Sequence, residues 1–268
     1  MELGIAGKIA LVTGGSKGIG RETSLELARA GCQVLVAARG KEAIDETVAV
    51  IRGVGGVAAG FSGDFTDVEN YRLAVAAAKA AFGSDPDIAV FNLQAPKPGS
   101  FEELNDDDFR WAYHLVVTCY MNLVRAVVPS MKERRWGRIV TIGSGTARMA
   151  LRSTPYFSYV LANTHRVSAV GLIKTLMGDY GPFGITFNTI GVGSIETEQF
   201  KAWMQKRADE SGVPYDDVIR GFAADNPLRR VGRPVEVAKL CTFLCSEYAG
   251  FTTGETVLCD GGQVICLP

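Results

Sequence analysis

Short apolar runs alternate with longer helical stretches along almost the whole of this 268-residue chain. The run from Lys8 to Val12 leads into a helical stretch ending near Ala30, and Gln33 to Ala37 begins the next repeat. This alternation predicts parallel strands joined by right-handed helical crossovers. Further strands are expected at 57–60, 87–92, 137–142, 185–190 and 255–259. We therefore predict an α/β fold: a Rossmann-like, doubly wound parallel sheet of about seven strands with helices on both faces.

One domain accounts for the length, because a single α/β domain commonly reaches about 250 residues. The sequence has no internal repeat, low-complexity tract or linker. Long helices are expected at 106–134 and 156–180, and a closing helix at 234–246. The segment 191–226 reads as irregular, and we interpret it as a substrate lid within a single domain, 1–268.

Composition argues against several classes of function. Lys plus Arg total 28 and Asp plus Glu total 29, for a net charge of −1, and no basic run interleaves with aromatic residues. We therefore expect neither a nucleic acid nor a membrane as a partner, and we expect a small-molecule substrate. The six cysteines form no Cys-x-x-Cys pair, so we expect core thiols, no metal site and a cytoplasmic protein. The N-terminus predicts neither a signal peptide nor a membrane span.

The strongest local signal is a glycine-rich turn between the first strand and the first helix. Glycines let the backbone approach a pyrophosphate, and the helix N-terminus offers free N–H groups with a partial positive charge. The context of strand, turn and helix makes this a dinucleotide site. Its expected cofactor-binding residues are Gly14, Ser16, Lys17, Gly18, Ile19 and Gly20.

The end of the second strand indicates which dinucleotide is bound. An acid there reads the ribose 2′-hydroxyl, but this chain has Val36-Ala37-Ala38-Arg39. Arg39 and Lys17 are instead suited to a 2′-phosphate. The sequence therefore predicts NADP(H) as the cofactor.

With these residues in view, the whole chain resembles the short-chain dehydrogenase/reductase family. The resemblance rests on motifs spread along the sequence: Thr13-Gly14-x3-Gly18-x-Gly20, Gly63-Asp64-Phe65, Pro129, Gly137-Arg138-Ile139-Val140, Ser144, Gly184-Ile185-Thr186-x-Asn188, Gly193-x3-Thr197 and Gly254-x4-Cys259-Asp260-Gly261-Gly262. It implies that Asp64, with Phe65 beside it, contacts the adenine and that Asn92 lines the cofactor cleft. It further implies that Ile195 and Thr197, after Gly193, hold the nicotinamide carboxamide. A homotetramer or homodimer is implied, with the 111–134 and 156–180 helices at interfaces.

The chain departs from that family where its usual chemistry lies. A Ser, a Tyr, a Lys and a helix Asn are usual, and the Lys charge lowers the Tyr pKa toward a useful range. Ser144 is present, but no Tyr-x3-Lys occurs. The register places Ala162 at the Tyr, Arg166 at the Lys and Val116 at the Asn. The catalytic set is therefore degenerate.

A different spacing offers a substitute. Tyr159 precedes Arg166 by seven residues, two helical turns, so that the pair shares a face. The spacing is similar to that of the enoyl reductases of the family. Arg166 is suited to the ribose hydroxyls but cannot shuttle a proton. The candidate catalytic residues are thus Ser144, Tyr159 and Arg166, with Tyr156 or water as alternative proton donors.

Other residues near the predicted cleft have open roles. Arg148 and Arg152 follow Ser144 and either bind an anion or are solvated. No further residues of the kind that bind metals accompany His114 and His165 in the sequence. In the lid, Phe200, Trp203 and Met204 share one helical face and form either a substrate wall or lid packing.

The function predicted from these features is an NADP(H)-dependent oxidoreductase. Its most fitting reaction is transfer of hydride from NADPH to a C=O, C=C or C=N bond of a small, partly apolar substrate. Two alternatives stay open because the usual catalytic residues are lost together. One is a non-redox elimination, isomerisation or cyclisation, and the other is a cofactor-binding subunit without catalysis.

Overall fold

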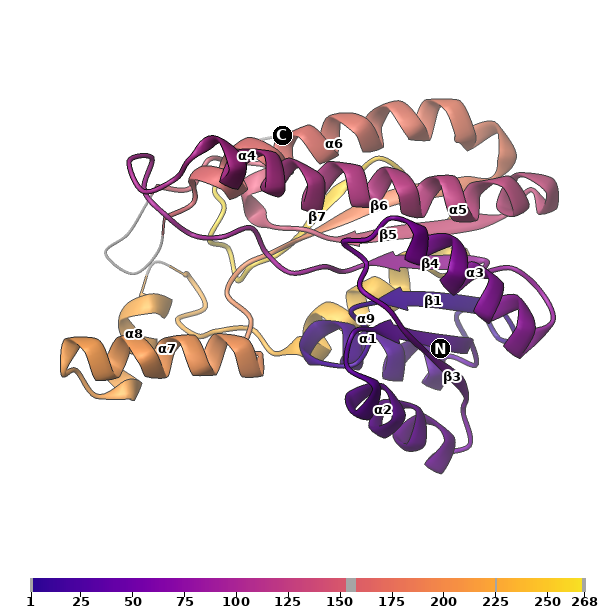
Figure 1. The fold of residues 1–268 in the computed structure, drawn as a ribbon, viewed down its shortest axis with the longest axis horizontal. Coiled ribbons are helices and arrows are strands. Elements are labelled where there is room, and N and C mark those ends of the chain that lie inside the picture. Colours follow the sequence, from indigo (N-terminus) through magenta and orange to yellow (C-terminus); the bar gives the residue numbers. More distant parts are fainter. Residues whose placement is uncertain (1, 153–157, 225, 267–268) are drawn as a thin grey trace.

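A single parallel sheet organises the chain in the computed structural model, which describes residues 2–152, 158–224 and 226–266 (Figure 1). Its order is β3-β2-β1-β4-β5-β6-β7, and every neighbouring pair is parallel. The strands are β1 Ile9–Thr13, β2 Gln33–Ala38, β3 Val57–Ser62, β4 Ile88–Phe91, β5 Gly137–Ile142, β6 Ile185–Val192 and β7 Thr256–Cys259. The predicted seven-stranded, doubly wound fold is confirmed.

Two layers of helices enclose the sheet (Figure 1). The helices are α1 Gly18–Arg29, α2 Lys41–Gly53, α3 Glu69–Phe82, α4 Asp106–Tyr113, α5 Cys119–Arg134, α6 Val160–Tyr180, α7 Glu198–Ser211, α8 Tyr215–Ala223 and α9 Pro234–Leu244. Short 3-10 turns lie at η2 Gly145–Ala147, η3 Gly181–Phe183 and η4 Glu247–Ala249, and a π-helical segment, η1 His114–Thr118, joins α4 to α5.

Alternation along each strand divides the core between the two faces of the sheet. Ala10 and Val12 of β1 are fully buried with side chains from α1, α2 and α9. Their neighbour Leu11 points the other way and packs with α3, α5 and α6. Strands apolar on both faces are what a covered parallel sheet requires, because a strand's successive side chains point to opposite faces.

The structure corrects several expected boundaries. The segment 191–226 is not irregular: its residues 191–192 complete β6, and α7 and α8 form a helical pair to one side of the sheet's helical layers (Figure 1). The expected helix at 106–134 is interrupted by the π-helical segment. The expected helix at 156–180 begins as α6 at Val160, with Tyr159 as its N-cap. These ends were misjudged because periodicity locates the middle of a helix better than its ends.

Candidate active site

The carboxyl ends of the parallel strands collect the predicted site residues along one edge of the sheet. The strand order reverses between β1 and β4, and in doubly wound folds a crevice between diverging loops is expected at such a switch point. The Thr13 hydroxyl closes the base of the crevice by donating to the Val90 carbonyl (3.1 Å) and accepting from Asn92 N (2.9 Å). Ligands of doubly wound folds bind at such a point.

The glycine turn lies in this crevice in a form that excludes side chains. A Cβ on Gly20 would lie 2.0 Å from the Gly14 carbonyl oxygen, and one on Gly14 would lie 2.5 Å from the Asn92 carbonyl oxygen. Gly14 and Gly18 also have positive φ, at 60° and 52°. The Asn92 amide donates to the Gly14 carbonyl (3.3 Å), so Asn92 holds the turn in place.

The N-terminus of α1 is open to a ligand. Its N-cap, Lys17, makes no side-chain cap, and the described residues supply no substitute. The free N–H groups and the helix dipole therefore face the crevice without an internal partner, as a phosphate site requires. Ser16 is buried, whereas Ile19 packs against the core and serves the turn structurally.

Two cations lie beside this turn. Lys17 follows β1 and Arg39 follows β2, and the two strands are held together beyond their pairing by Gly15 N donating to the Ala37 carbonyl (3.1 Å). Both side chains are exposed, and neither forms an ion pair with the part of the chain that the structure describes. They are therefore available to an anionic group on the adenosine side of the site.

Asp64 lies at the end of β3 on the same side. It accepts hydrogen bonds from Thr66 N and the Thr66 hydroxyl, both at 2.9 Å. The backbone bond from Thr66 chiefly lowers the Asp64 pKa, with Arg39 contributing, so the group is a carboxylate at neutral pH. Phe65 points into the core beside Tyr71, 5.0 Å between ring centroids, so its backbone is what a ligand can reach.

Ser144 is the polar group on the β5 side of the crevice. It is half-buried and caps η2 by accepting from Thr146 N at 3.3 Å. Accepting this bond leaves the Ser144 O–H free to donate. A hydroxyl held in this way is suited to polarise a substrate oxygen.

The first turn of α6 lies beside the Ser144 loop. The Thr146 hydroxyl donates to the Ala162 carbonyl (3.4 Å), which brings Ala162 beside the Ser144 loop. Arg166 lies one turn later on the same face and is half-buried. Its Nε is buried and donates to none of the residues described. Burial lowers the Arg166 pKa to about 10, so it remains a cation at neutral pH.

Of the two candidate tyrosines, Tyr159 lies within the described residues. Tyr159 is half-buried at the N-cap of α6, two turns before Arg166. Tyr156 lies outside the described residues. Val116 is buried in the π-helical segment and packs with Ala169, so no amide stands at that position.

Sequence reasoning missed Asn163. Its side chain accepts from Leu151 N (3.1 Å) and donates to the Leu151 carbonyl (2.9 Å), which fastens the loop after η2 to α6. That loop carries Arg148 and Arg152, both exposed. The available signal was an amide next to Ala162 on a helix that must pass close to the Ser144 loop.

The segment that leads into α7 lies against the glycine turn through Thr197. A Cβ on Gly18 would lie 3.1 Å from Thr197 Cγ2, and the Thr197 hydroxyl caps α7 at Phe200 N (3.1 Å). Ile195 is buried, and its backbone pairs with Gly232. Gly193 lies against Asp260, where a Cβ would approach the Asp260 Cα to 2.8 Å.

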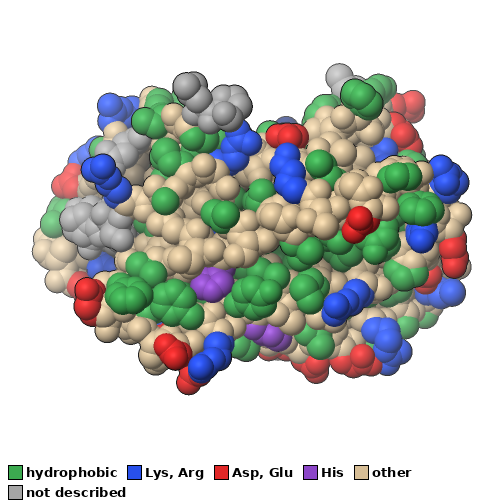
Figure 2. Space-filling model, turned by 90° about the horizontal axis from the view of Figure 1, so that it is seen from above, with side chains coloured by type: hydrophobic (Ala, Val, Ile, Leu, Met, Phe, Trp, Pro, Cys, Tyr) green, Lys and Arg blue, Asp and Glu red, His purple; other side chains and the backbone are tan. Residues whose placement is uncertain are grey.

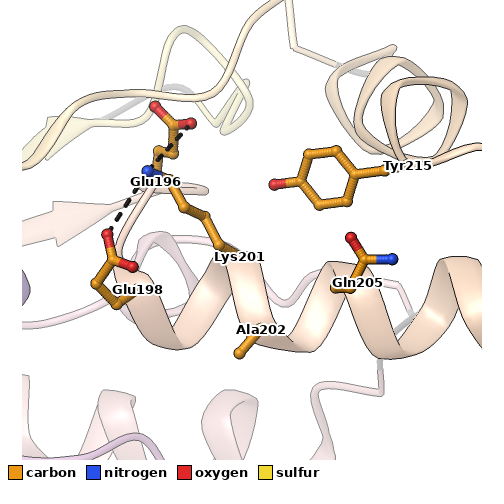
Figure 3. A pocket seen from close by; sticks show the side chains of 6 residues that line it. All are labelled: Glu196, Glu198, Lys201, Ala202, Gln205 and Tyr215. Atoms are coloured by element: carbon orange, nitrogen blue, oxygen red, sulfur yellow. Dashed lines mark ion pairs between the residues drawn. The ribbon is translucent and has the colours of Figure 1, made fainter.

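The apolar residues of the lid mainly pack with each other. Met204 is fully buried, and Phe200 meets Phe222 edge-on at 5.5 Å. A separate, open hollow of about 500 Å³ lies between α7 and α8 (Figure 3). It is lined by Glu196, Glu198, Lys201, Ala202, Gln205 and Tyr215. Lys201 pairs there with Glu198 (3.6 Å) and Glu196 (3.9 Å), pairs that contribute little because they are exposed.

The two histidines that sequence analysis singled out contact backbone carbonyls. His114 Nε2 bonds the Thr66 carbonyl (2.7 Å), and His165 Nδ1 lies 2.9 Å from the Leu161 carbonyl. All six cysteines are free thiols. No group of His, Cys, Asp or Glu within the described ranges is arranged to hold a metal ion. Across those ranges, no helix is both long and apolar enough to cross a membrane.

Comparison with known proteins agrees with this geometry. The family model for enoyl-(acyl carrier protein) reductase matches residues 14–263. Human dehydrogenase/reductase SDR family member 4 is 32% identical over 96% of this chain and 88% of its own. The 2,3-dihydro-2,3-dihydroxybenzoate dehydrogenase of Bacillus subtilis is 30% identical over 98% of both chains. L-sorbose reductase of Gluconobacter frateurii, solved with NADPH and L-sorbose, superposes with a TM-score of 0.92 at 26% identity, covering 100% of both chains.

The matched span takes in both the glycine turn and the strand ends described above. The chain belongs to the short-chain dehydrogenase/reductase family and is an oxidoreductase of that family.

Proposed function

We propose that this oxidoreductase is an NADPH-dependent reductase of a C=O, C=C or C=N bond in a small, partly apolar substrate. The observation that carries the proposal is the uncapped N-terminus of α1 behind a turn that admits only glycine. Solved neighbours such as L-sorbose reductase and the actinorhodin polyketide ketoreductase are complexes with NADPH. Relatives named as reductases and dehydrogenases do not favour the non-redox and non-catalytic alternatives.

The residues present fit the dinucleotide. The α1 N-terminus would receive the pyrophosphate, Lys17 and Arg39 the 2′-phosphate, and Asp64 the adenine amino group. The backbone of Ile195 and the Thr197 side chain would hold the nicotinamide carboxamide. When bound, NADPH supplies the hydride.

The chain's own groups then act on the substrate. Ser144 donates its free O–H to the substrate oxygen and orients the acceptor carbon. Arg166 donates to the ribose hydroxyls and remains protonated throughout. The proton that balances the hydride comes from Tyr159 in this proposal and goes to the oxygen, nitrogen or carbon left electron-rich. Its phenol belongs to the N-cap residue of α6, two helical turns before Arg166.

A substrate panel tests the proposal directly. Purified protein with NADPH is offered a ketone, an enone and a cyclic imine, and NADPH absorbance is followed with product analysis. Substrate-dependent loss of absorbance with reduced product supports the proposal. Product formed without a change in NADPH would contradict it and indicate non-redox chemistry.

Removing the positive charges of Lys17 and Arg39 should weaken the preference of the protein for NADPH over NADH. For the double variant Lys17→Ala, Arg39→Ala we expect an NADPH Kd about 10- to 100-fold higher, because charge-assisted hydrogen bonds to the 2′-phosphate are lost. The NADH Kd should change less than threefold, on the order of 0.6 kcal/mol. Fluorescence titration with both cofactors measures this, and Lys41→Ala, in an exposed pair with Asp45, is the matched control. An equal loss for both cofactors would contradict the assignment.

The effect on kcat of removing the proposed proton donor, Tyr159, should depend on the substrate. Tyr159→Phe is expected to lower kcat for a ketone about 10²-fold, the usual contribution of general acid catalysis. An iminium carries its own proton and should be reduced at nearly the original rate. Tyr248→Phe, an exposed tyrosine in η4, is the control. If Tyr156→Phe abolishes ketone reduction and Tyr159→Phe does not, the donor is Tyr156.

We also propose a homo-oligomer, a dimer or tetramer, assembled through the face of α4, α5 and α6. Figure 2 shows apolar side chains gathered on this face, with histidine among them. Trp111 is 45%, Tyr113 48% and Val167 53% exposed on these helices, and exposed apolar side chains gathered on one face are typical of an interaction surface. Light scattering tests the assembly, and a monomer at micromolar concentration would contradict it.

We place the protein in the cytoplasm on the pattern of its free cysteines.

A further inference from the structure

Arg166 is a half-buried cation whose Nε has no hydrogen-bond partner among the described residues. Its Nε is shielded from solvent, and the guanidinium donates no hydrogen bond and forms no ion pair within the described ranges. Removing a cation from water is costly unless an anion or several acceptors replace the lost hydration. The residue is half-buried as a whole, so part of it remains open to a ligand.

Its place on α6 indicates which ligand can reach it. Arg166 lies one turn after Ala162, which is tied to the Ser144 loop, and three residues before Ala169, which packs on Val116. Along α6, the position of Arg166 therefore lies between the residue tied to the Ser144 loop and the residue that packs with Val116. A methyl group at Ala162 also leaves room beside Ser144 that a larger side chain would fill. Because one helical turn advances about 5.4 Å, a substrate at Ser144 needs to extend only about that far along α6 to meet Arg166.

The cofactor does not neutralise this charge. Ribose hydroxyls accept hydrogen bonds but are uncharged, and within the described ranges no carboxylate forms an ion pair with Arg166. The acid at this edge, Asp260, already accepts from Gly262 N (2.9 Å) and Val264 N (2.7 Å). The lid acids Glu196 and Glu198 are engaged with Lys201.

The loop after Ser144 adds further positive charge. Arg148 and Arg152 are exposed on it and form no ion pair within the described residues. The double hydrogen bond between Asn163 and Leu151 fixes this loop against α6, at the helix end that carries Arg166. The approach to Ser144 is therefore cationic, which favours anions.

Resting on the proposed reductase function, we propose that Arg166 binds the carboxylate of the substrate. The substrate class is then carboxylic acids whose reducible C=O or C=C bond is conjugated with the carboxylate. The planar guanidinium matches a carboxylate with paired hydrogen bonds, which lysine does not. Ser144 then meets the reacting end of the same molecule.

The test compares a carboxylate with its neutral counterpart of the same shape. Calorimetric titration of the protein saturated with NADP⁺ uses crotonate and crotonamide as probes. We expect crotonate to bind at least tenfold more tightly. Arg166→Met should abolish this preference, Arg166→Lys should keep part of it, and Arg29→Gln, an exposed arginine on α1, should keep all of it.

The preference ratio separates this inference from the proposed function. Equal binding of the two probes, no binding of crotonate, or a preference that survives in Arg166→Met would overturn it, even if NADPH-dependent reduction persists. The wild-type comparison decides the matter should the variants fail to fold. Absence of NADP⁺ binding would instead overturn the proposed function itself.

Discussion

Replacing Gly20 by alanine is expected to abolish cofactor binding, raising the NADPH Kd by more than about 10²-fold, on the order of 3 kcal/mol. The added methyl would lie 2.0 Å from the Gly14 carbonyl oxygen and 2.7 Å from the Asn92 amide nitrogen. Neither position leaves room for a carbon, so the turn must move away from the α1 N-terminus. Fluorescence titration with NADPH measures the loss.

The matched control is Gly53→Ala at the end of α2, where the new methyl meets nothing within 4 Å. Circular dichroism and the melting temperature show whether each variant is folded. A folded Gly20→Ala protein that binds NADPH within threefold of the original would show that the turn does not hold the cofactor.

Ser144→Ala should give the second largest effect. We expect kcat to fall about 10²- to 10³-fold, the usual result of removing a donor to developing oxyanion charge. The NADPH Kd should stay unchanged, because Ser144 lies on the substrate side of the crevice and caps only η2. Steady-state kinetics with the best substrate of the panel, together with NADPH titration, separates the two quantities.

A serine at the opposite edge of the sheet supplies the control for this variant. Ser84 lies between α3 and β4, and Ser84→Ala should retain full activity. Full activity in Ser144→Ala would remove Ser144 from the mechanism, while a parallel loss of NADPH binding would assign it a structural role.

The sheet was readable from the sequence because each strand carries its own signal. A strand buried on both faces must be almost continuously apolar, as Ile9–Thr13 and Ile88–Phe91 are. Glycines that no other residue can replace likewise mark the turn after β1. The cofactor half of the site therefore follows from local pattern alone, although the role of each residue remains a proposal.

The substrate half was less accessible to sequence reasoning. The hydrogen bonds between Asn163 and Leu151 join residues that are 12 positions apart. Because the sequence between them has no periodicity, no sequence pattern predicts this contact. The unsatisfied state of Arg166 depends on what surrounds it, such as the buried Val116 floor. Lid helices α7 and α8 were missed because Gly212 and Pro214 break the chain between them.

NADPH titration of the purified protein, monitored by NADPH fluorescence and repeated with NADH, tests most directly whether the glycine turn and its cations bind the dinucleotide. We expect saturable binding of NADPH at one site per chain, in the micromolar range or tighter, with NADH at least tenfold weaker. Absence of saturable binding of either dinucleotide would contradict it.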